Sequence, residues 1–212
     1  CGLYEVDPTT FGVLDDELTT FADNFGSRTR HWIGVDLTMN VRMDNGLLLQ
    51  GGVSTGRTTE DQCELNANLN NPSQLFCATE TPFLTQVKLL GSYTLPGDIQ
   101  IAGTIQSLPG FQIGANVVYT GAELSTALGR TSNVSNRTIQ VIEPGTLYSK
   151  RLNQFDLRVT KNLNLGPGQY RLMFDLYNVF NANSVMAETA SFDNPATWLT
   201  PEVIMPGRLA KL

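Results

Sequence analysis

Apolar and polar residues alternate almost without interruption over residues 31–56. The apolar set runs from Ile33 to Met43 at odd positions, and Gly34, Asp36, Thr38, Asn40 and Arg42 lie between its members. The segment 44–46, Asp-Asn-Gly, interrupts the pattern, which then resumes in phase. A period of two with a Gly-containing tight turn predicts a β-hairpin with one apolar and one polar face. Either a protein core or lipid must cover the apolar face.

The same alternation predicts more strands further along the chain. One is expected over 83–95 and another over 98–120, where odd positions stay apolar on both sides of Pro109. We therefore expect one long bent strand there rather than two, although proline cannot donate to a strand ladder. A further hairpin is predicted over 151–181 around the Gly-Pro-Gly turn at 166–168, and residues 205–212 read as the opening of a last strand.

Short and long connections alternate strictly between these strands. Tight turns are expected at 44–46, 96–98 and 166–168, and long loops at 1–30, 57–82, 121–146 and 182–203. Outer-membrane barrels have short periplasmic turns and long extracellular loops. The pattern therefore predicts an all-β, antiparallel, up-and-down transmembrane β-barrel segment of about seven strands, spanning residues 1–212.

Composition and strand character favour lipid over a protein core. Charged residues make up 16% of the chain, against roughly 25% in soluble domains. Each expected strand has about ten or more residues, enough to cross a bilayer when tilted. Aromatic residues fall near strand ends of the apolar face, as membrane interfaces require: Phe83, Tyr93, Tyr119, Phe155, Tyr170 and Phe180. A soluble antiparallel sheet with one solvated face shows the same alternation and remains an alternative.

Charged residues lie in mid-strand on the opposite face. In the hairpin 151–181, Asp156 and Arg158 are expected to lie opposite Arg171 and Asp175 and to form ion pairs that face a barrel lumen. Charged residues are also expected on the polar face of the other strands: Asp36, Arg42 and Lys88.

The chain contains three cysteines, an odd number. Cys63 and Cys77 bracket a polar stretch and are expected to form a disulfide in an oxidising compartment, the alternative being two free thiols. Cys1 would then pair upstream or with another molecule.

Charge and hydropathy exclude other classes. A net charge of −6 without a basic patch argues against nucleic acid as a partner. No apolar run reaches the length of a transmembrane helix, and no basic n-region followed by an apolar h-region occurs in the sequence. Because it starts at Cys1, the chain is expected to be mature, truncated or a fragment.

Four segments resemble the C-terminal barrel of TonB-dependent receptors, and most of all the Oar-like group whose members carry a carboxypeptidase-regulatory-like domain. They are "HWIGVDLTMNVRMDNGLLLQGGVSTGRTTED" with its cysteine loop, "KRLNQFDLRVTKNLNLG", "LMFDLYNVFNANSV" and the closing "IMPGRLAKL". The resemblance implies a barrel of about 22 strands around an internal plug. It also implies uptake or export of a bulky ligand across the outer membrane, energised by TonB.

The chain departs from that family pattern. Its seven expected strands cannot close a single-chain bacterial barrel, and it has no plug domain, no TonB box and no terminal aromatic residue. It is therefore expected to be a C-terminal piece, with lipid, an unknown ligand, the rest of the barrel and the TonB system as partners.

Catalytic and cofactor motifs are absent from the sequence. The single histidine, His31, stands beside Trp32 and is read as part of an interfacial aromatic belt rather than a ligand contact. No zinc motif and no nucleophile motif occurs, so neither a metal, a cofactor nor enzymatic activity is expected. Asp156 and Asp175 have arginine neighbours and read as ion-pair members rather than an acid–base pair.

Three functions follow as hypotheses. The first is a receptor segment at the bacterial outer membrane and cell surface, with Asp193 and Trp198 in ligand-contacting loops. The second is a structural tube or filament assembled through open strand edges, with Cys1 as a further link. The third is a soluble β-sandwich adhesin.

Overall fold

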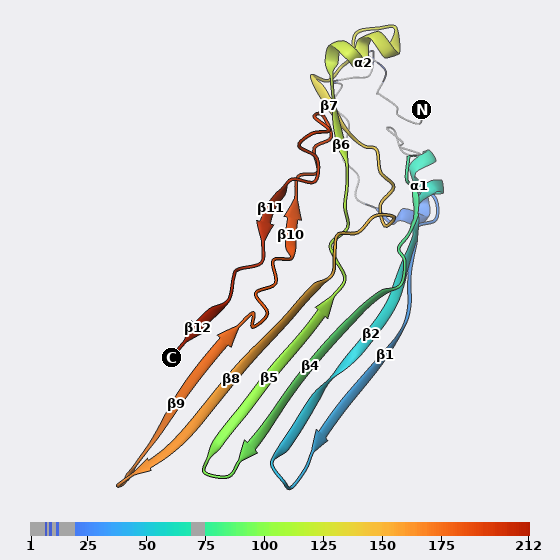
Figure 1. The fold of residues 1–212 in the computed structure, drawn as a ribbon. Coiled ribbons are helices and arrows are strands. Elements are labelled where there is room, and N and C mark those ends of the chain that lie inside the picture. Colours follow the sequence, from blue (N-terminus) through green and yellow to red (C-terminus); the bar gives the residue numbers. More distant parts are fainter. Residues whose placement is uncertain (1–6, 8, 10–11, 13–19, 69–74) are drawn as a thin grey trace.

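A single antiparallel sheet dominates the computed structural model, which describes residues 7, 9, 12, 20–68 and 75–212. Seven of its eight strands lie in the order β1-β2-β4-β5-β8-β9-β12, so each pairs with the next long strand of the chain, and β3 pairs with the end of β2. The order is that of an up-and-down meander (Figure 1). β1 and β12 are the two edges of the sheet, which is open.

The elements have the following bounds: η1 Ala22–Asn24, β1 Thr29–Arg42, β2 Leu47–Asp61, α1 Cys63–Asn68, β3 Ala78–Glu80, β4 Leu84–Leu95, β5 Ile99–Leu108, β6 Asn116–Thr120, α2 Gly121–Leu128, β7 Asn136–Gln140, β8 Leu152–Leu165, β9 Gly168–Tyr177, β10 Val185–Glu188, β11 Pro201–Ile204 and β12 Leu209–Lys211.

All three tight turns lie at one end of the sheet, and the long connections lie at the other (Figure 1). Each turn contains a glycine with positive φ: Gly46 at 86°, Gly97 at 84° and Gly166 at 62°. Glycine adopts this left-handed conformation without steric cost, which is why the hairpins close there. We name the two ends the tight-turn end and the long-loop end. The predicted antiparallel strands and their alternating connections are confirmed, whereas closure into a barrel is not observed.

The expectation of one strand over 98–120 is wrong. β5 ends at Leu108, and the chain then crosses Pro109 and Gly110 in an irregular stretch. A side chain at Gly110 would meet the Ser149 carbonyl, so the two segments approach closely there. β6 pairs instead with β7 in a separate two-stranded sheet. The strand stops just before Pro109, because proline lacks the N–H needed to continue the ladder.

The long connections contain structure that the alternation does not predict. α1 and β3 lie in the connection 62–83, α2 and β7 in 109–151, and β10 pairs with β11 in 178–208. β1 also begins at Thr29 and β2 runs to Asp61, so these two strands extend into residues expected to be loop. Most of the expected loop 1–30 lies outside the described residues. No helix in the described part of the chain is long and apolar enough to cross a membrane.

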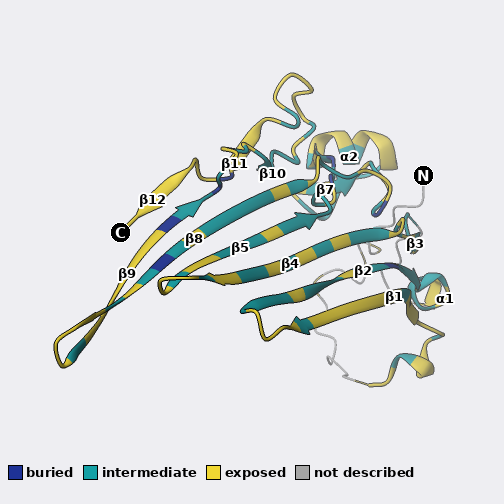
Figure 2. Ribbon diagram, turned by 60° about the horizontal axis from the view of Figure 1, so that its bottom comes forward, coloured by how far each residue is buried: buried dark blue, intermediate teal, exposed yellow. Residues whose placement is uncertain are grey.

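Among the residues that the structure describes, no hydrophobic core lies under the sheet. In the described residues, the buried apolar side chains are Ile113, Ala115 and Met205, all in the long connections. Figure 2 shows exposed and half-buried residues along every long strand and no second layer covering them. The structure is therefore a one-layer sheet whose stability in isolation cannot come from a packed interior.

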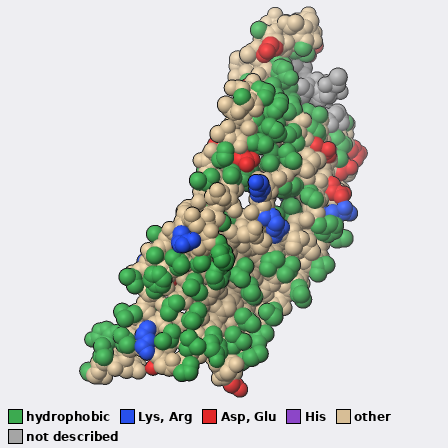
Figure 3. Space-filling model, viewed as in Figure 1, with side chains coloured by type: hydrophobic (Ala, Val, Ile, Leu, Met, Phe, Trp, Pro, Cys, Tyr) green, Lys and Arg blue, Asp and Glu red, His purple; other side chains and the backbone are tan. Residues whose placement is uncertain are grey.

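One face of this sheet is apolar over its whole middle. We call it the apolar face: the odd-numbered residues of β1, β2, β4, β5 and β8 and the even-numbered residues of β9. Ile33, Val35 and Leu37 on it are 62%, 67% and 69% exposed. Figure 3 shows hydrophobic side chains spread over the sheet with few charged groups among them.

Charged side chains on the apolar face stand near its borders. Arg57 and Asp61 lie toward the long-loop end of β2, and Lys161 lies toward the tight-turn end of β8. The Lys161 ammonium donates to the carbonyl of Gly97 in the adjacent turn, so its charge reaches away from the apolar middle. Tyr119, which we expected among the aromatic residues of this face, lies in β6 and is not part of the sheet.

Candidate functional site: the polar face of the sheet

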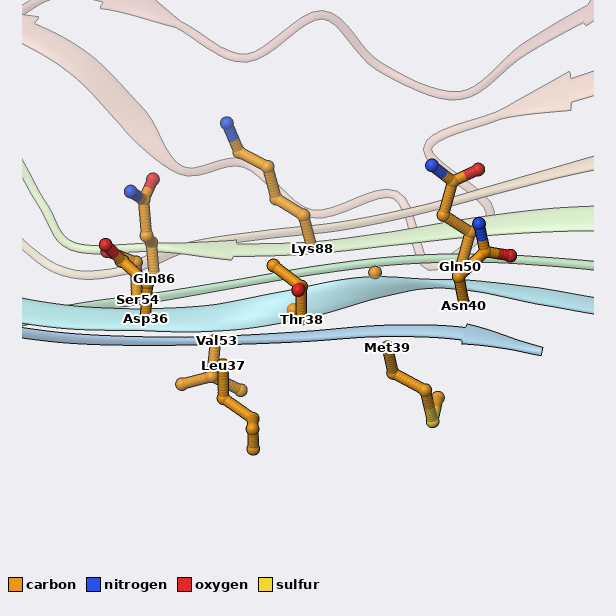
Figure 4. A pocket seen from close by; sticks show the side chains of 12 residues that line it. Asp36, Leu37, Thr38, Met39, Asn40, Gln50, Val53, Ser54, Gln86 and Lys88 are labelled. Carbon is orange, nitrogen blue, oxygen red and sulfur yellow. The ribbon is translucent and has the colours of Figure 1, made fainter.

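The opposite face of the sheet carries polar and charged side chains, and we call it the polar face. Figure 4 shows Asp36, Lys88 and Gln50 pointing to one side of the β1–β2 ribbon, and Leu37 and Met39 pointing to the other. This two-sidedness follows from the strand period of two, with no bulge between β1 and β2. The polar face is the candidate functional site because it gathers most of the charged groups of the long strands.

An open hollow of about 680 Å³ lies on β1, β2 and β4. Its polar lining comes from three neighbouring strands: Asp36, Thr38, Asn40, Gln50, Ser54, Gln86 and Lys88. Within the described chain, the side chains of Lys88 and Asp36 have no hydrogen bond or ion pair. We call this site the hollow.

The register explains how Lys88 stands at the centre of the hollow. Gly52 lies directly opposite Lys88 on β2, and Thr38 lies opposite Gly52 on β1. A side chain at Gly52 would meet the Leu37 carbonyl oxygen at 2.5 Å, so the position requires glycine. The resulting gap leaves the Lys88 side chain upright and exposed.

Trp32 lies next to the hollow on the polar face. The sequence pattern did not identify it as a residue of this site. Added side-chain carbons at Gly34 and Gly56 would both fall on the indole ring, so the ring covers these two glycines. Its residue is still 55% exposed. Even parity places Trp32 with Asp36 on the polar face, as residue counting alone could have shown.

Arg158 and Asp175 form the ion pair expected between β8 and β9. They are direct partners in the register, and both Asp175 oxygens accept from the guanidinium, at 2.5 Å from Nε and 2.9 Å from Nη2. The Tyr177 hydroxyl donates to the same carboxylate at 3.2 Å. Asp175 is 7% exposed, so a paired, bidentate geometry is what keeps this charge stable in place.

The second expected pair, Asp156 with Arg171, is not formed. Arg171 lies opposite Asn162 and donates to its side-chain oxygen at 3.1 Å. Asp156 lies opposite Thr104 of β5 and accepts from Gln154 Nε2 at 2.9 Å. The hairpin register separates Asp156 and Arg171 by several residues along the strands, which parity cannot reveal.

Asn178 connects the end of β9 to the stretch just before β12 through hydrogen bonds. It is 3% exposed and has φ of 49°. Its amide nitrogen donates to the carbonyls of Ala182 and Pro206, both at 2.9 Å, and its side-chain oxygen accepts from the Ala182 N–H at 2.8 Å. Its backbone N–H donates to Asp156 at 2.8 Å. The segment "FDLYN" therefore contributes to two groups of polar contacts at this corner, one around Asp175 and one around Asn178.

Asp193 and Trp198, expected in ligand-contacting loops, make contacts within the chain. Asp193 accepts from the Val118 N–H at 2.8 Å, and the Trp198 indole N–H donates to the Gly114 carbonyl at 3.1 Å. Trp198 also packs edge-on against Phe192. These contacts join the connection 178–208 to the stretch before and within β6. Asp193 itself is exposed.

Cys63 and Cys77 form the expected disulfide at the long-loop end. It closes the connection that holds α1. The neighbouring Glu64 accepts from the Ser27 N–H at 3.0 Å. Hydrogen bonds from the Ser27 backbone and side chain lower the pKa of that carboxyl. Cys1 lies outside the described residues.

Metal-ligating side chains are not clustered: in the part of the chain that the structure describes, no three His, Cys, Asp or Glu residues are placed to hold a metal ion together.

No protein-family model matches this chain, and neither the comparison with curated proteins nor that with solved structures found a match. A functional proposal therefore rests on the residues and geometry of the chain itself.

Proposed function

We propose that this chain forms part of the wall of a TonB-dependent outer-membrane receptor, which binds a bulky ligand and moves it across the outer membrane. The observation that carries the proposal is a one-layer sheet with an exposed apolar face and a charged opposite face. The sequence resemblance described above points the same way.

The exposed apolar face needs a non-aqueous partner. Burying one Val, Leu or Ile side chain contributes about 1.5–3 kcal/mol. The face exposes Ile33, Val35 and Leu37 on β1, Val53 on β2, Ile101 and Ile105 on β5, Leu165 on β8 and Leu172 on β9. The polar face cannot take a hydrophobic layer, because Asp36 and Lys88 would then lose water without gaining a partner. Lipid on one side and a solvated interior on the other satisfy both faces.

Strand length and charge placement fit a membrane-spanning wall. β1, β2 and β8 have 14, 15 and 14 residues, and a tilted transmembrane strand needs about 9–11. Charged side chains of the apolar face stand toward its two ends, as Arg57 and Lys161 do. In this orientation the tight turns are periplasmic and the long loops extracellular, where the Cys63–Cys77 disulfide persists.

The edges β1 and β12 are where the remainder of such a barrel would pair. β1 has 14 residues whose outer edge is unpaired in the described sheet. The TonB system would act through other parts of the receptor, and no nucleic acid or enzymatic role is proposed.

Flotation tests the membrane assignment. The purified chain, refolded in detergent and transferred to phosphatidylethanolamine–phosphatidylglycerol vesicles, should float with them in a density gradient and stay bound after an alkaline carbonate wash. A chain that remains monomeric in buffer without detergent and sediments away from the vesicles would contradict the proposal.

The open edges favour a second candidate, a tube or filament assembled from copies of the chain. β1 and β12 run in the same direction, because an even number of strand reversals separates them. Pairing of β12 with β1 of a like-oriented copy would therefore be parallel, and antiparallel β1–β1 pairing would point the long loops in opposite directions. Negative-stain electron microscopy of detergent-free material decides: ordered tubes support this candidate, and dispersed vesicle-bound particles refute it.

The third candidate, a β-sandwich adhesin, would require a second sheet packed on the first. The two small hairpins, β6–β7 and β10–β11, lie toward the long-loop end and do not cover the long strands (Figure 1).

A further inference from the structure

We infer that the polar face from Trp32 through the hollow is a subsite for a neutral oligosaccharide. This inference deepens the proposed receptor function and rests on it, because the polar face then lines the ligand path. It combines an open aromatic surface with a row of uncommitted hydrogen-bonding side chains.

Trp32 supplies the aromatic surface. Its indole rests on the backbone at Gly34 and Gly56, so the two glycines hold one side of the ring and leave it 55% exposed. An aromatic ring presents an electron-rich face, and the C–H face of a pyranose ring packs on such a surface. Because the surrounding residues are polar, the exposed indole gains little by packing against them. Its open side is suited to stacking on a sugar ring.

The hollow continues directly from this ring. Asp36, Ser54 and Gln86 form the next cross-strand row after Gly34 and Gly56, and the Thr38–Gly52–Lys88 row follows. From residue 34 to residue 40 the strand rises about 20 Å, a length that accommodates several linked sugar rings. The hollow has a volume of about 680 Å³, and its polar lining lies on the polar face of the sheet.

The chemistry of the hollow matches hydroxyl groups. Asp36 only accepts and Lys88 only donates hydrogen bonds, whereas the amides of Asn40, Gln50 and Gln86 do both. Vicinal sugar hydroxyls also donate and accept. One carboxylate and one ammonium give the hollow no net formal charge, which favours a neutral ligand over a polyanion or polycation.

The contrast with β8 and β9 separates this site from structural pairing. Arg158 and Asp175 on the same polar face are bound to each other at 2.5 Å. Lys88 and Asp36 have no such partner in the described chain, so their hydrogen-bonding capacity is available to a ligand.

Calorimetric titration of the detergent-folded chain with malto-, cello-, xylo- and chitohexaose tests the inference, with hexagalacturonate as the charged comparison. At least one neutral hexasaccharide should bind more tightly than hexagalacturonate. Trp32→Ala should weaken that binding by about tenfold, as expected for a lost aromatic contact, and Lys88→Met should weaken it as well. Tyr170→Ala removes a comparably exposed aromatic residue from the apolar face and should leave binding unchanged.

A fluorescence readout reports the site itself. In a Trp198→Phe background Trp32 is the only tryptophan, and the bound hexasaccharide should shift its emission to shorter wavelength. Absence of binding by all four neutral sugars, or binding that Trp32→Ala does not change, overturns the inference. Flotation of the same preparation keeps the two proposals apart: a chain that floats but binds no sugar refutes the subsite alone, and a chain that does not float refutes the receptor wall.

Discussion

Single side chains decide how the ends of neighbouring strands are held in this sheet. Asn178 is nearly fully buried and uses its amide nitrogen, its amide oxygen and its backbone N–H at once. Its φ of 49° is a conformation that asparagine tolerates better than most residues. The corner between β9 and β12 therefore depends on this one residue type.

Asn178→Ala should destabilise the fold by about 2–4 kcal/mol, because two carbonyls and one N–H lose their partners at a buried site. Urea unfolding in detergent micelles, followed by circular dichroism, measures the change. Asn164→Ala is the matched control: the Asn164 side chain is exposed and has no hydrogen bond in the described chain, and this variant should unfold like the wild type. Equal midpoints for both variants would refute the role given to Asn178.

At the scale of elements, paired glycines shape the β1–β2 hairpin. Gly34 and Gly56 are direct cross-strand partners, and together they make room for the indole of Trp32. The hairpin thereby carries a large aromatic ring flat on its polar face instead of a row of short side chains.

Gly56→Ala should displace this ring, because the added methyl group would occupy the space of the indole. In the Trp198→Phe background we expect the emission of Trp32 to move to longer wavelength and to become more accessible to iodide. Gly114→Ala is the control, since its methyl group would meet only the Gln140 side chain, at 3.5 Å. Identical spectra and quenching for Gly56→Ala and the wild type would contradict the placement of Trp32.

α2 begins with a capping box. The Thr120 hydroxyl accepts from the Glu123 N–H, and the Glu123 carboxylate accepts from the Thr120 N–H at 2.8 Å. The hydrogen bonds from the Thr120 backbone and side chain lower the pKa of Glu123. A carboxyl whose pKa is lowered by folding stabilises the fold above its unfolded pKa, about 4.3 for Glu, and loses this contribution as the pH falls through the lower folded pKa.

The Glu123 side-chain carboxyl carbon should therefore titrate at a lower pH than an ordinary glutamate in carbon-13 NMR, with the Thr120 amide resonance following it. Glu123→Gln should abolish the pH dependence of that amide resonance. A titration midpoint above the ordinary glutamate value would show that the box is not formed.

The sequence pattern predicts the long strands well because alternation is a local consequence of a two-faced sheet. It does not show which strands pair: β6 pairs with β7 outside the main sheet, and no residue between 111 and 120 carries that information in its period. α2 had a readable signal in Thr120, Glu123 and Gly129, which match a capping box and a left-handed C-cap. α1 is six residues long and too short to show a helical period.

The candidate site, too, could be predicted from the sequence only in part. Parity places Asp36, Lys88, Arg158 and Asp175 on one face, but partners depend on register. The two-residue turn between Leu165 and Gly168 sets Arg158 opposite Asp175 and leaves Arg171 opposite Asn162. Counting outward from that turn would have corrected the expected Asp156–Arg171 pair. The hollow around Lys88 requires β1, β2 and β4 together, and strand order is not contained in the alternation.

At the scale of the whole molecule, the sheet has two faces and no interior. The buried apolar residues of the described chain lie in the long connections, outside the sheet. Stability and function thus depend on what meets each face: lipid on the apolar face and an aqueous, ligand-accessible space on the polar face, in the proposed receptor wall.

Accessibility of successive β1 positions tests this central claim most directly. Single spin labels at residues 35 to 40, introduced as cysteines in a Cys1→Ser background with the Cys63–Cys77 disulfide intact, are measured in phospholipid vesicles. Collisions with oxygen should peak at 35, 37 and 39, and collisions with a water-soluble nickel complex should peak at 36, 38 and 40. Odd positions shielded from both reagents, or a profile without a period of two, would contradict a lipid-facing apolar sheet.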